Sequence, residues 1–408
     1  MIIQNRKINN IIRTVGIFIF MFIYFTPEYV TGFINKSPGL DSMHSFLKIF
    51  SFIIVYASGK YIKISVPAIF VILNSVIIFI SQYVNGGSVM ISVSWLITYL
   101  TMYRLVEKYY ECNEIILLKG IYYYFLTISL LNFLTLLLFP EGVFDGPHSF
   151  SKKANFLLGS YNGFIEYYFT GILAGYLLTR RQCKKMSISW YVLWLISFLS
   201  IGFIRVSATS MMGMILLAFS FCFMHTRYIK KILNMGTYTV FILIFFIFIV
   251  LLRQNIWIVS VVSDMFAKSS TFSGRATVWD AALKLIKEHF IWGNGMQAIE
   301  TLRENLAGTS QAHNIILTRF YQTGVIGATI EFSFFFYVMS KTKRIKDMDI
   351  KFFFEAITGV SLLMGMFESR STGIIFLNLC LIFYCSKQYE NRINKKNVYQ
   401  GILQYSIN

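Results

Sequence analysis

The stretch Val240–Leu252, with the sequence VFILIFFIFIVLL, decides the fold of this chain, because thirteen consecutive residues are apolar and none is charged. A helix needs about 20 mostly apolar residues to cross the hydrocarbon core of a bilayer. With its flanking residues, this stretch predicts a membrane-spanning helix near 237–257. Further runs of this kind predict spans near 13–30, 41–58, 64–83, 88–105, 117–139, 162–179, 188–204, 207–225, 322–340, 352–368 and 372–386. The sequence therefore predicts an all-α, polytopic integral membrane protein with about 12 transmembrane helices.

The composition of the whole chain agrees with this prediction. Of its 408 residues, 56% are hydrophobic and 14% are charged, whereas a soluble globular domain carries roughly 25% charged residues. Of the five cysteines, Cys112 and Cys183 fall in segments predicted to face the cytoplasm, and Cys222, Cys380 and Cys385 fall in predicted spans. This pattern excludes a soluble enzyme, a disordered chain and a secreted disulfide scaffold.

The net charge of +18 is explained by membrane topology and not by nucleic-acid binding. Lys and Arg collect on the cytoplasmic loops of membrane proteins. With both termini cytoplasmic, the predicted inside segments carry 24 of the 37 Lys and Arg residues, and the outside segments carry 12. We therefore expect no nucleic-acid partner.

One long outside connection, residues 258–321, breaks the pattern of short loops, and long loops in compact proteins tend to be functional. It divides the chain into helices one to nine (1–257), the loop itself, and helices ten to twelve with a basic cytoplasmic tail (322–408). Apolar residues recur at helical spacing from Val278 to Ile286 and predict an amphipathic helix that can lie along the lipid headgroups. A second short helix is expected near Met296–Leu306.

Two candidate functional residues lie in this loop. Arg275 follows Ser273 and Gly274 at the expected start of the amphipathic helix, where backbone N–H groups favour an anion and a guanidinium can bind phosphate oxygens with two hydrogen bonds. An arginine that neutralises lipid headgroups is the alternative. His313, followed by Asn314, carries an imidazole that can accept a proton near neutral pH, and the alternative is an amphipathic side chain at the membrane interface.

Further candidates lie in other predicted outside turns. Arg205 precedes the serine-rich segment 207–210 and could contact a phosphate or sugar or anchor the chain at the headgroups. Glu368 and Arg370 could form a mutual ion pair or part of a polar site. The loop at 140–161, with Asn162 directly after it, could line an acceptor site or be a solvated loop.

Metal and cofactor motifs give no positive signal. The sequence contains no H-E-x-x-H, Walker loop, C-x-x-C or G-x-S-x-G pattern. Asp347-Met348-Asp349 matches a D-x-D pattern, but it lies in a Lys-rich connection predicted to be cytoplasmic. We expect no cofactor and no catalytic metal.

The order of motifs around the long loop resembles the signature of the O-antigen polymerase and ligase superfamily, which includes Wzy-type polysaccharide polymerases. That signature is approximately S-G-R-x3-W, E-H-P-hydrophobic-x-G-x-G, H-N and G-hydrophobic2-G. Phe290 stands where proline is common. The matching residues are Ser273-Gly274-Arg275 with Trp279, Glu288-His289-Phe290-Ile291-Trp292-Gly293-Asn294-Gly295, Ala312-His313-Asn314 and Gly324-Val325-Ile326-Gly327.

The resemblance implies an inverting, metal-independent glycosyltransferase of the cytoplasmic membrane. Its substrate would be an oligosaccharide repeat unit on undecaprenyl diphosphate, and its product a capsular, exo- or O-antigen polysaccharide. By this likeness Arg275 and Arg205 would engage the diphosphate and His313 would assist the acceptor hydroxyl. We add Asn314, Glu368 and Arg370 as candidate diphosphate- or sugar-binding residues.

Membrane lipids, a chain-length regulator and a flippase are the partners that such an enzyme would have. The motifs do not separate a polymerase from a ligase that transfers glycan to another acceptor. A lipid-linked oligosaccharide flippase or secondary transporter is the alternative from another class. Its best evidence is the carboxylates Glu331 and Glu355 in predicted spans, since charge within a membrane is functional by default.

Overall fold

The computed structural model describes residues 2–57, 64–145, 154–182, 185–252, 275–368 and 371–405. The first part of the chain forms α1 (Ile2–Tyr24), α2 (Glu28–Asn35), α3 (Pro38–Ala57), α4 (Val66–Val84), α5 (Met90–Cys112) and α6 (Glu114–Leu138). A short antiparallel pair, β1 (Phe144–Asp145) and β2 (Ala154–Asn155), follows. The middle part forms α7 (Phe164–Gln182), α8 (Ile188–Leu199), the π-helical turn η1 (Ser200–Ile204), α9 (Ala208–Cys222), α10 (Arg227–Ile232), α11 (Met235–Phe245) and the π-helical turn η2 (Phe246–Leu251). The last part forms α13 (Arg275–Glu288), α14 (Ile299–Asn305), α15 (Ile315–Thr342), α16 (Met348–Gly365) and α17 (Thr372–Tyr405).

Each of the twelve predicted apolar runs falls on helical segments in the described part of the chain. The prediction of twelve membrane crossings is not confirmed. Judged by length and composition, four of the described helices, α3, α4, α6 and α15, can cross a bilayer. The pair α1 and α2 would add a fifth, and it is bent by 65°. Pro27 lies at this bend, where its missing N–H cannot continue the helical hydrogen bonds. The chain is a multi-pass helical membrane protein with four or five such helices in its described part.

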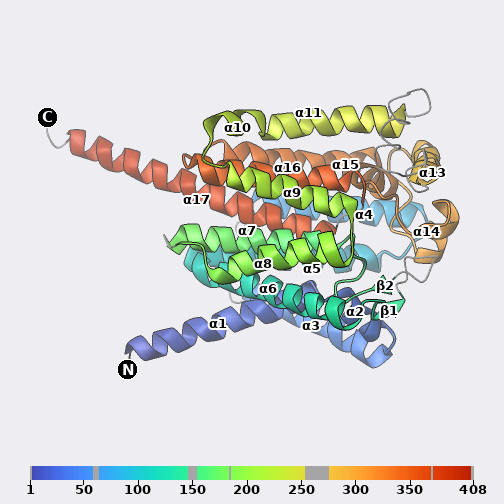
Figure 1. Cartoon of the computed structure of the whole chain (residues 1–408), viewed down its shortest axis with the longest axis horizontal. Helices are drawn as coiled ribbons and strands as arrows, with labels where there is room; N and C mark the ends of the chain where they lie inside the picture. The colour runs from blue at the N-terminus through green and yellow to red at the C-terminus, as the bar shows by residue number, and fades with distance from the viewer. Residues whose placement is uncertain are drawn as a thin grey trace.

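The helices form one bundle whose two ends differ (Figure 1). The N-terminal end of α1 and the C-terminal end of α17 project from one end of the bundle, and α13, α14 and the β1–β2 pair lie at the other. At the end that carries the termini, basic residues form ion pairs, including Lys230 Nζ with Asp349 Oδ1 at 2.5 Å and Arg181 Nε with Glu114 Oε2 at 3.2 Å. This arrangement is the one expected if both termini lie on the side opposite the 258–321 loop.

The described part of the long loop has the two helices that the sequence predicts. On α13 the apolar residues Val278, Trp279, Ala282 and Ile286 are buried, and the charged residues after Arg275 face outward. The prediction that this helix lies along the headgroups is not supported, because its apolar face packs against α15 and the residue Leu306 after α14. The loop also ends earlier than residue 321, since Asn314 caps α15 and the helix begins at Ile315. Residues 258–274 of the predicted loop lie outside the described residues.

Candidate active site

Four segments that are far apart in sequence meet around one carboxylate at the α13–α14 end of the bundle. Glu368, in the turn after α16, is 6% exposed. His313 Nδ1, just before α15, is 3.0 Å from Glu368 Oε2, and the Arg275 guanidinium, at the start of α13, donates to Glu368 Oε1. Asn162, just before α7, donates from Nδ2 to the same oxygen at 3.1 Å. A general-base candidate, a phosphate-binding candidate and a carboxylate are thus in direct contact.

The backbone of His313 is held in a rarely occupied conformation. Its φ of +48° lies in the left-handed region, which few residues other than glycine adopt and which often marks functional sites. On one side, the indole N–H of the buried Trp279 donates to the carbonyl oxygen of Ala312 at 3.1 Å. On the other side, Asn314 Oδ1 accepts from the Leu317 N–H at 3.1 Å and caps α15. These contacts fix the residues on both sides of His313 and so fix where its ring points.

Asn314 uses its whole side chain in this structural role. It is fully buried, and its Nδ2 donates to the carbonyl oxygen of Met366 at 3.0 Å. Asn314 therefore joins the segment that carries His313 to the turn that carries Glu368. This geometry favours a positioning role for Asn314 over the predicted contact with substrate.

The glycine motifs form a backbone junction beside the site. Gly324 breaks α15 with φ 62° and ψ −169°, values that are accessible essentially to glycine alone. The freed N–H of Val325 donates to the carbonyl oxygen of Phe290 at 2.8 Å, and the N–H of Asn294 donates to Tyr321 O at 2.7 Å. A Cβ on Gly324 would overlap the carbonyl of Ile291. The break therefore needs glycine both for its dihedral angles and for the close approach of the 290–294 segment.

The C-terminal end of α4 contacts the same junction. Asn85 Nδ2 donates to the carbonyl oxygen of Gly293 at 2.9 Å, and Ser81 Oγ donates to the carbonyl oxygen of Gln322 at 3.0 Å. Gln82 Nε2 donates to the carbonyl oxygen of Met296 at 3.0 Å. The segment after α13 and the break in α15 are thus fixed to each other and to the bundle, which sets the position of α13 and of Arg275 on it.

Asn162 connects the serine-rich segment 207–210 to the site. Ser207 Oγ donates to Asn162 Oδ1 at 2.8 Å, which assigns the opposite end of the amide, Nδ2, to Glu368. Ser210 Oγ donates to the main-chain carbonyl of Asn162 at 3.2 Å. The sequence placed Asn162 only beside a possible acceptor loop, and gave no signal that it contacts Glu368.

The structure does not bring every predicted site residue into this cluster. The guanidinium of Arg205, which follows the π-helical turn η1, donates to the carbonyl oxygen of Pro140 and lies 5.5 Å from the centre of the Phe156 ring. Arg205 therefore lies beside Pro140 and Phe156, and hydrogen bonds among the described residues connect its segment to Glu368 through Ser207 and Asn162. Arg370 lies outside the described residues, so its predicted pairing with Glu368 stays a prediction.

The acidic residues of the D-x-D pattern have structural partners. Asp347 Oδ1 accepts from the backbone N–H groups of Asp349 and Ile350 and caps α16. The carboxylate of Asp349 pairs with Lys230. Within the described ranges, no group of three or more His, Cys, Asp or Glu side chains is placed to hold a metal ion.

Residues 192–331 match the protein family described as O-antigen ligase. The match confirms the resemblance to the O-antigen polymerase and ligase superfamily, and it contains Arg205, Arg275 and His313. Asn162 and Glu368, which complete the cluster, lie outside the matched stretch. No curated protein matches the sequence of the chain.

Proposed function

We propose that this chain is a glycosyltransferase that polymerises oligosaccharide repeat units carried on undecaprenyl diphosphate, at the outer face of the cytoplasmic membrane. The likeness to the O-antigen ligase family supports a lipid-linked glycan substrate. The observation that carries the proposal is the direct contact of His313 and Arg275 with Glu368. The polymer would be a capsular, exo- or O-antigen polysaccharide.

In this proposal His313 is the general base. With its Nδ1–H donating to Glu368, the Nε2 atom of the neutral ring is the one that can accept a proton. The acceptor hydroxyl gives its proton to Nε2 as its oxygen attacks the anomeric carbon of the donor sugar. The carboxylate of Glu368 stabilises the imidazolium that forms and keeps the ring in the required orientation.

Arg275 would stabilise the leaving group. As the new glycosidic C–O bond forms with inversion, the bond between the anomeric carbon and the phosphate oxygen breaks, and its electron pair leaves with the lipid diphosphate. The Arg275 side chain is 19% exposed and shares its carboxylate partner with His313 and Asn162. A diphosphate at the edge of the cluster can therefore attract the guanidinium, whose planar array of N–H groups fits two phosphate oxygens.

The other predicted site residues have less direct parts in this proposal. Arg205 and Arg370 would bind the second phosphate or the sugars from the neighbouring turns, and Asn314 would hold His313 in place. The mechanism requires neither a cofactor nor a metal, because the diphosphate leaving group is already activated. We propose further that residues 258–321 are extracytoplasmic, that both termini are cytoplasmic and that the chain crosses the membrane twelve times.

A ligase remains the second candidate, because the family match itself bears the description O-antigen ligase. The two activities differ in the acceptor. A chain-length regulator and a flippase would be partners of the polymerase. Deletion of the gene separates the candidates, because loss of a polymerase leaves single lipid-linked repeat units, whereas loss of a ligase leaves long polymer that is not attached. Absence of repeat units from the outer leaflet would instead indicate a flippase.

The direct test uses purified protein in liposomes with a defined lipid-linked repeat unit, and polymer is resolved by length. We expect His313→Ala to lower turnover per folded molecule by about 10²–10⁴, and Arg275→Lys to lose most activity because an ammonium cannot bind two oxygens in the same way. Lys284→Ala, on the exposed face of α13, is the control and should leave turnover unchanged. A chelator should have no effect. Normal polymer from both site variants would refute the proposed mechanism.

A further inference from the structure

Helix α15 carries an ion pair that closes across its own break. Arg319 Nε lies 2.8 Å from Glu331 Oε2, and both side chains are largely buried. The two residues are twelve positions apart in the sequence, a separation of about 18 Å along a straight helix. The break at Gly324 makes their contact possible. Asn74 on α4 donates to the second oxygen, Oε1 of Glu331, at 3.1 Å.

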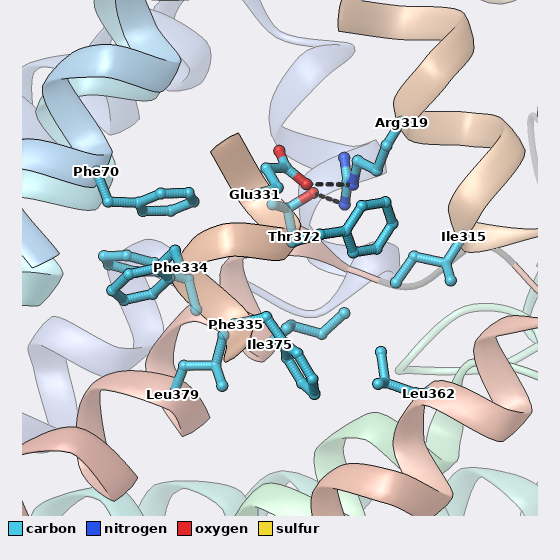
Figure 2. Close-up of a pocket in the computed structure, with 12 residues that line it drawn as sticks. Phe70, Ile315, Arg319, Glu331, Phe334, Phe335, Leu362, Thr372, Ile375 and Leu379 are labelled. Carbon is cyan, nitrogen blue, oxygen red and sulfur yellow. Dashed lines mark hydrogen bonds and ion pairs between the residues drawn. The ribbon is translucent and has the colours of Figure 1, made fainter. Parts of the chain in front are cut away.

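The surroundings of this pair are apolar. Figure 2 shows Arg319 and Glu331 at the edge of a partly open cavity, with Phe70, Phe334 and Phe335 among the side chains around it. The cavity volume is about 50 Å³. Desolvation of two charges in such surroundings is costly, so a buried ion pair is weak evidence of a gain in stability. The positions in which the pair holds its neighbours are therefore a better guide to its role than any gain in stability.

Arg319 also contacts the start of α17. Its guanidinium donates to the hydroxyl of Thr372, the first residue of α17 and four residues after Glu368 (Figure 2). Arg319 itself lies six residues after His313, in the first half of α15. Arg319 thus links α15, which begins beside the candidate base, to the start of α17, four residues after the carboxylate on which this base depends.

Helix α7 bonds to Ser371, the residue before Thr372. Both carboxylate oxygens of Glu166 accept from the N–H of Ser371, at 3.1 and 2.9 Å. Four residues earlier, Asn162 donates to Glu368 itself. Ser371 is therefore bonded to α7 and Thr372 to α15, and the bond from Arg319 adds to the one from Asn314 to Met366, which joins the start of α15 to the residues before Glu368.

We infer that Arg319 and Glu331 are positioning residues of the transferase site. Glu331 orients the Arg319 guanidinium, Arg319 holds Thr372 at the start of α17, and this bond helps to keep Glu368, four residues earlier, beside His313. This inference rests on the proposed function. It also gives Glu331, one of the two carboxylates that supported a transporter, a role that involves no transported ion.

The test replaces Thr372 by a side chain of nearly the same shape that lacks the hydroxyl. In the liposome polymerisation assay, Thr372→Val loses the bond from Arg319, and we expect kcat per folded molecule to fall about tenfold. The KM for the lipid-linked donor should stay within about twofold, because no group that binds the donor changes. Thr372→Ser keeps the hydroxyl and should restore kcat. Thr358→Val, at a buried threonine ten residues before Glu368 on α16, is the matched control.

A double-mutant cycle shows whether Thr372 acts through Glu368. If it does, Thr372→Val should cost much less in a Glu368→Gln background than in the wild type. Glu331→Gln provides a second variant and should lower kcat in the same way. An active wild type whose kcat is unchanged by Thr372→Val, or fully additive losses in the cycle, would overturn the positioning role alone. A wild type inactive on lipid-linked glycans would overturn the proposed function and this inference with it.

Discussion

The charge of Glu368 can be tested by Glu368→Gln, which keeps the shape of the side chain and its ability to accept a hydrogen bond. In the structure the carboxylate contacts His313 Nδ1 at 3.0 Å. A hydrogen bond to a charged group contributes about 1.5–3 kcal/mol, and a neutral one about 0.5–1.5 kcal/mol. Loss of the charge should therefore cost the developing imidazolium about 1–2 kcal/mol, which lowers kcat about 5- to 30-fold.

The same variant should not weaken, and could strengthen, the binding of the lipid-linked donor. Arg275 loses its carboxylate partner in Glu368→Gln and becomes more available to a diphosphate. We therefore expect the KM for the lipid-linked donor to be unchanged or lower while kcat falls. Initial rates of polymer formation over a range of donor concentrations give both constants, with Glu300→Gln on the exposed side of α14 as the control. An unchanged kcat in Glu368→Gln would refute the role of the carboxylate in the base mechanism.

Three further predictions concern the scaffold and the topology. Gly324→Ala should sharply reduce the yield of folded protein, because a Cβ there meets backbone, whereas Gly16→Ala has open space and should be tolerated. Trp279→Phe leaves the buried carbonyl before His313 without its indole donor, and we expect a loss of about 1–3 kcal/mol in stability, measured by thermal unfolding in detergent. In a cysteine-free background, Glu304→Cys should react with an impermeant thiol reagent in intact cells and Lys346→Cys only after permeabilisation, and the reverse pattern would invert the topology.

Local sequence patterns were sufficient to locate the helices but not to count the membrane crossings. Long apolar runs are a local property, and in the described part of the chain each of the twelve falls on helical segments, the first of them on two helices. The N-terminal run 13–30 was predicted as one span, yet the chain bends by 65° around Pro27. The amphipathic period of α13 correctly gave its buried face, but periodicity does not say whether that face meets lipid or protein.

The site shows the same limit at the level of single residues. Motif order associated Arg275, Trp279 and His313 with one function, but their mutual contacts depend on long-range packing. Sequence proximity suggested Arg370 as a partner of Glu368, and this pairing stays a prediction, but proximity could not suggest the partner 93 residues earlier, Arg275. A carboxylate whose partners come from three other segments has no local signature, so its part in the site required the fold.

The glycines of the motifs make the buried ion pair between Arg319 and Glu331 possible. Gly293 and Gly324 allow the 290–294 segment to approach α15 at backbone distance, and this segment takes up the hydrogen bonds that the break in α15 frees. The break lies between Arg319 and Glu331, which meet across it. Since Arg319 then holds Thr372, four residues after Glu368, we infer that these glycines influence the chemistry from a distance, without contacting substrate. A substitution at Gly324 that still allowed folding should therefore reproduce the kinetic defect of Thr372→Val, with kcat reduced and the donor KM preserved.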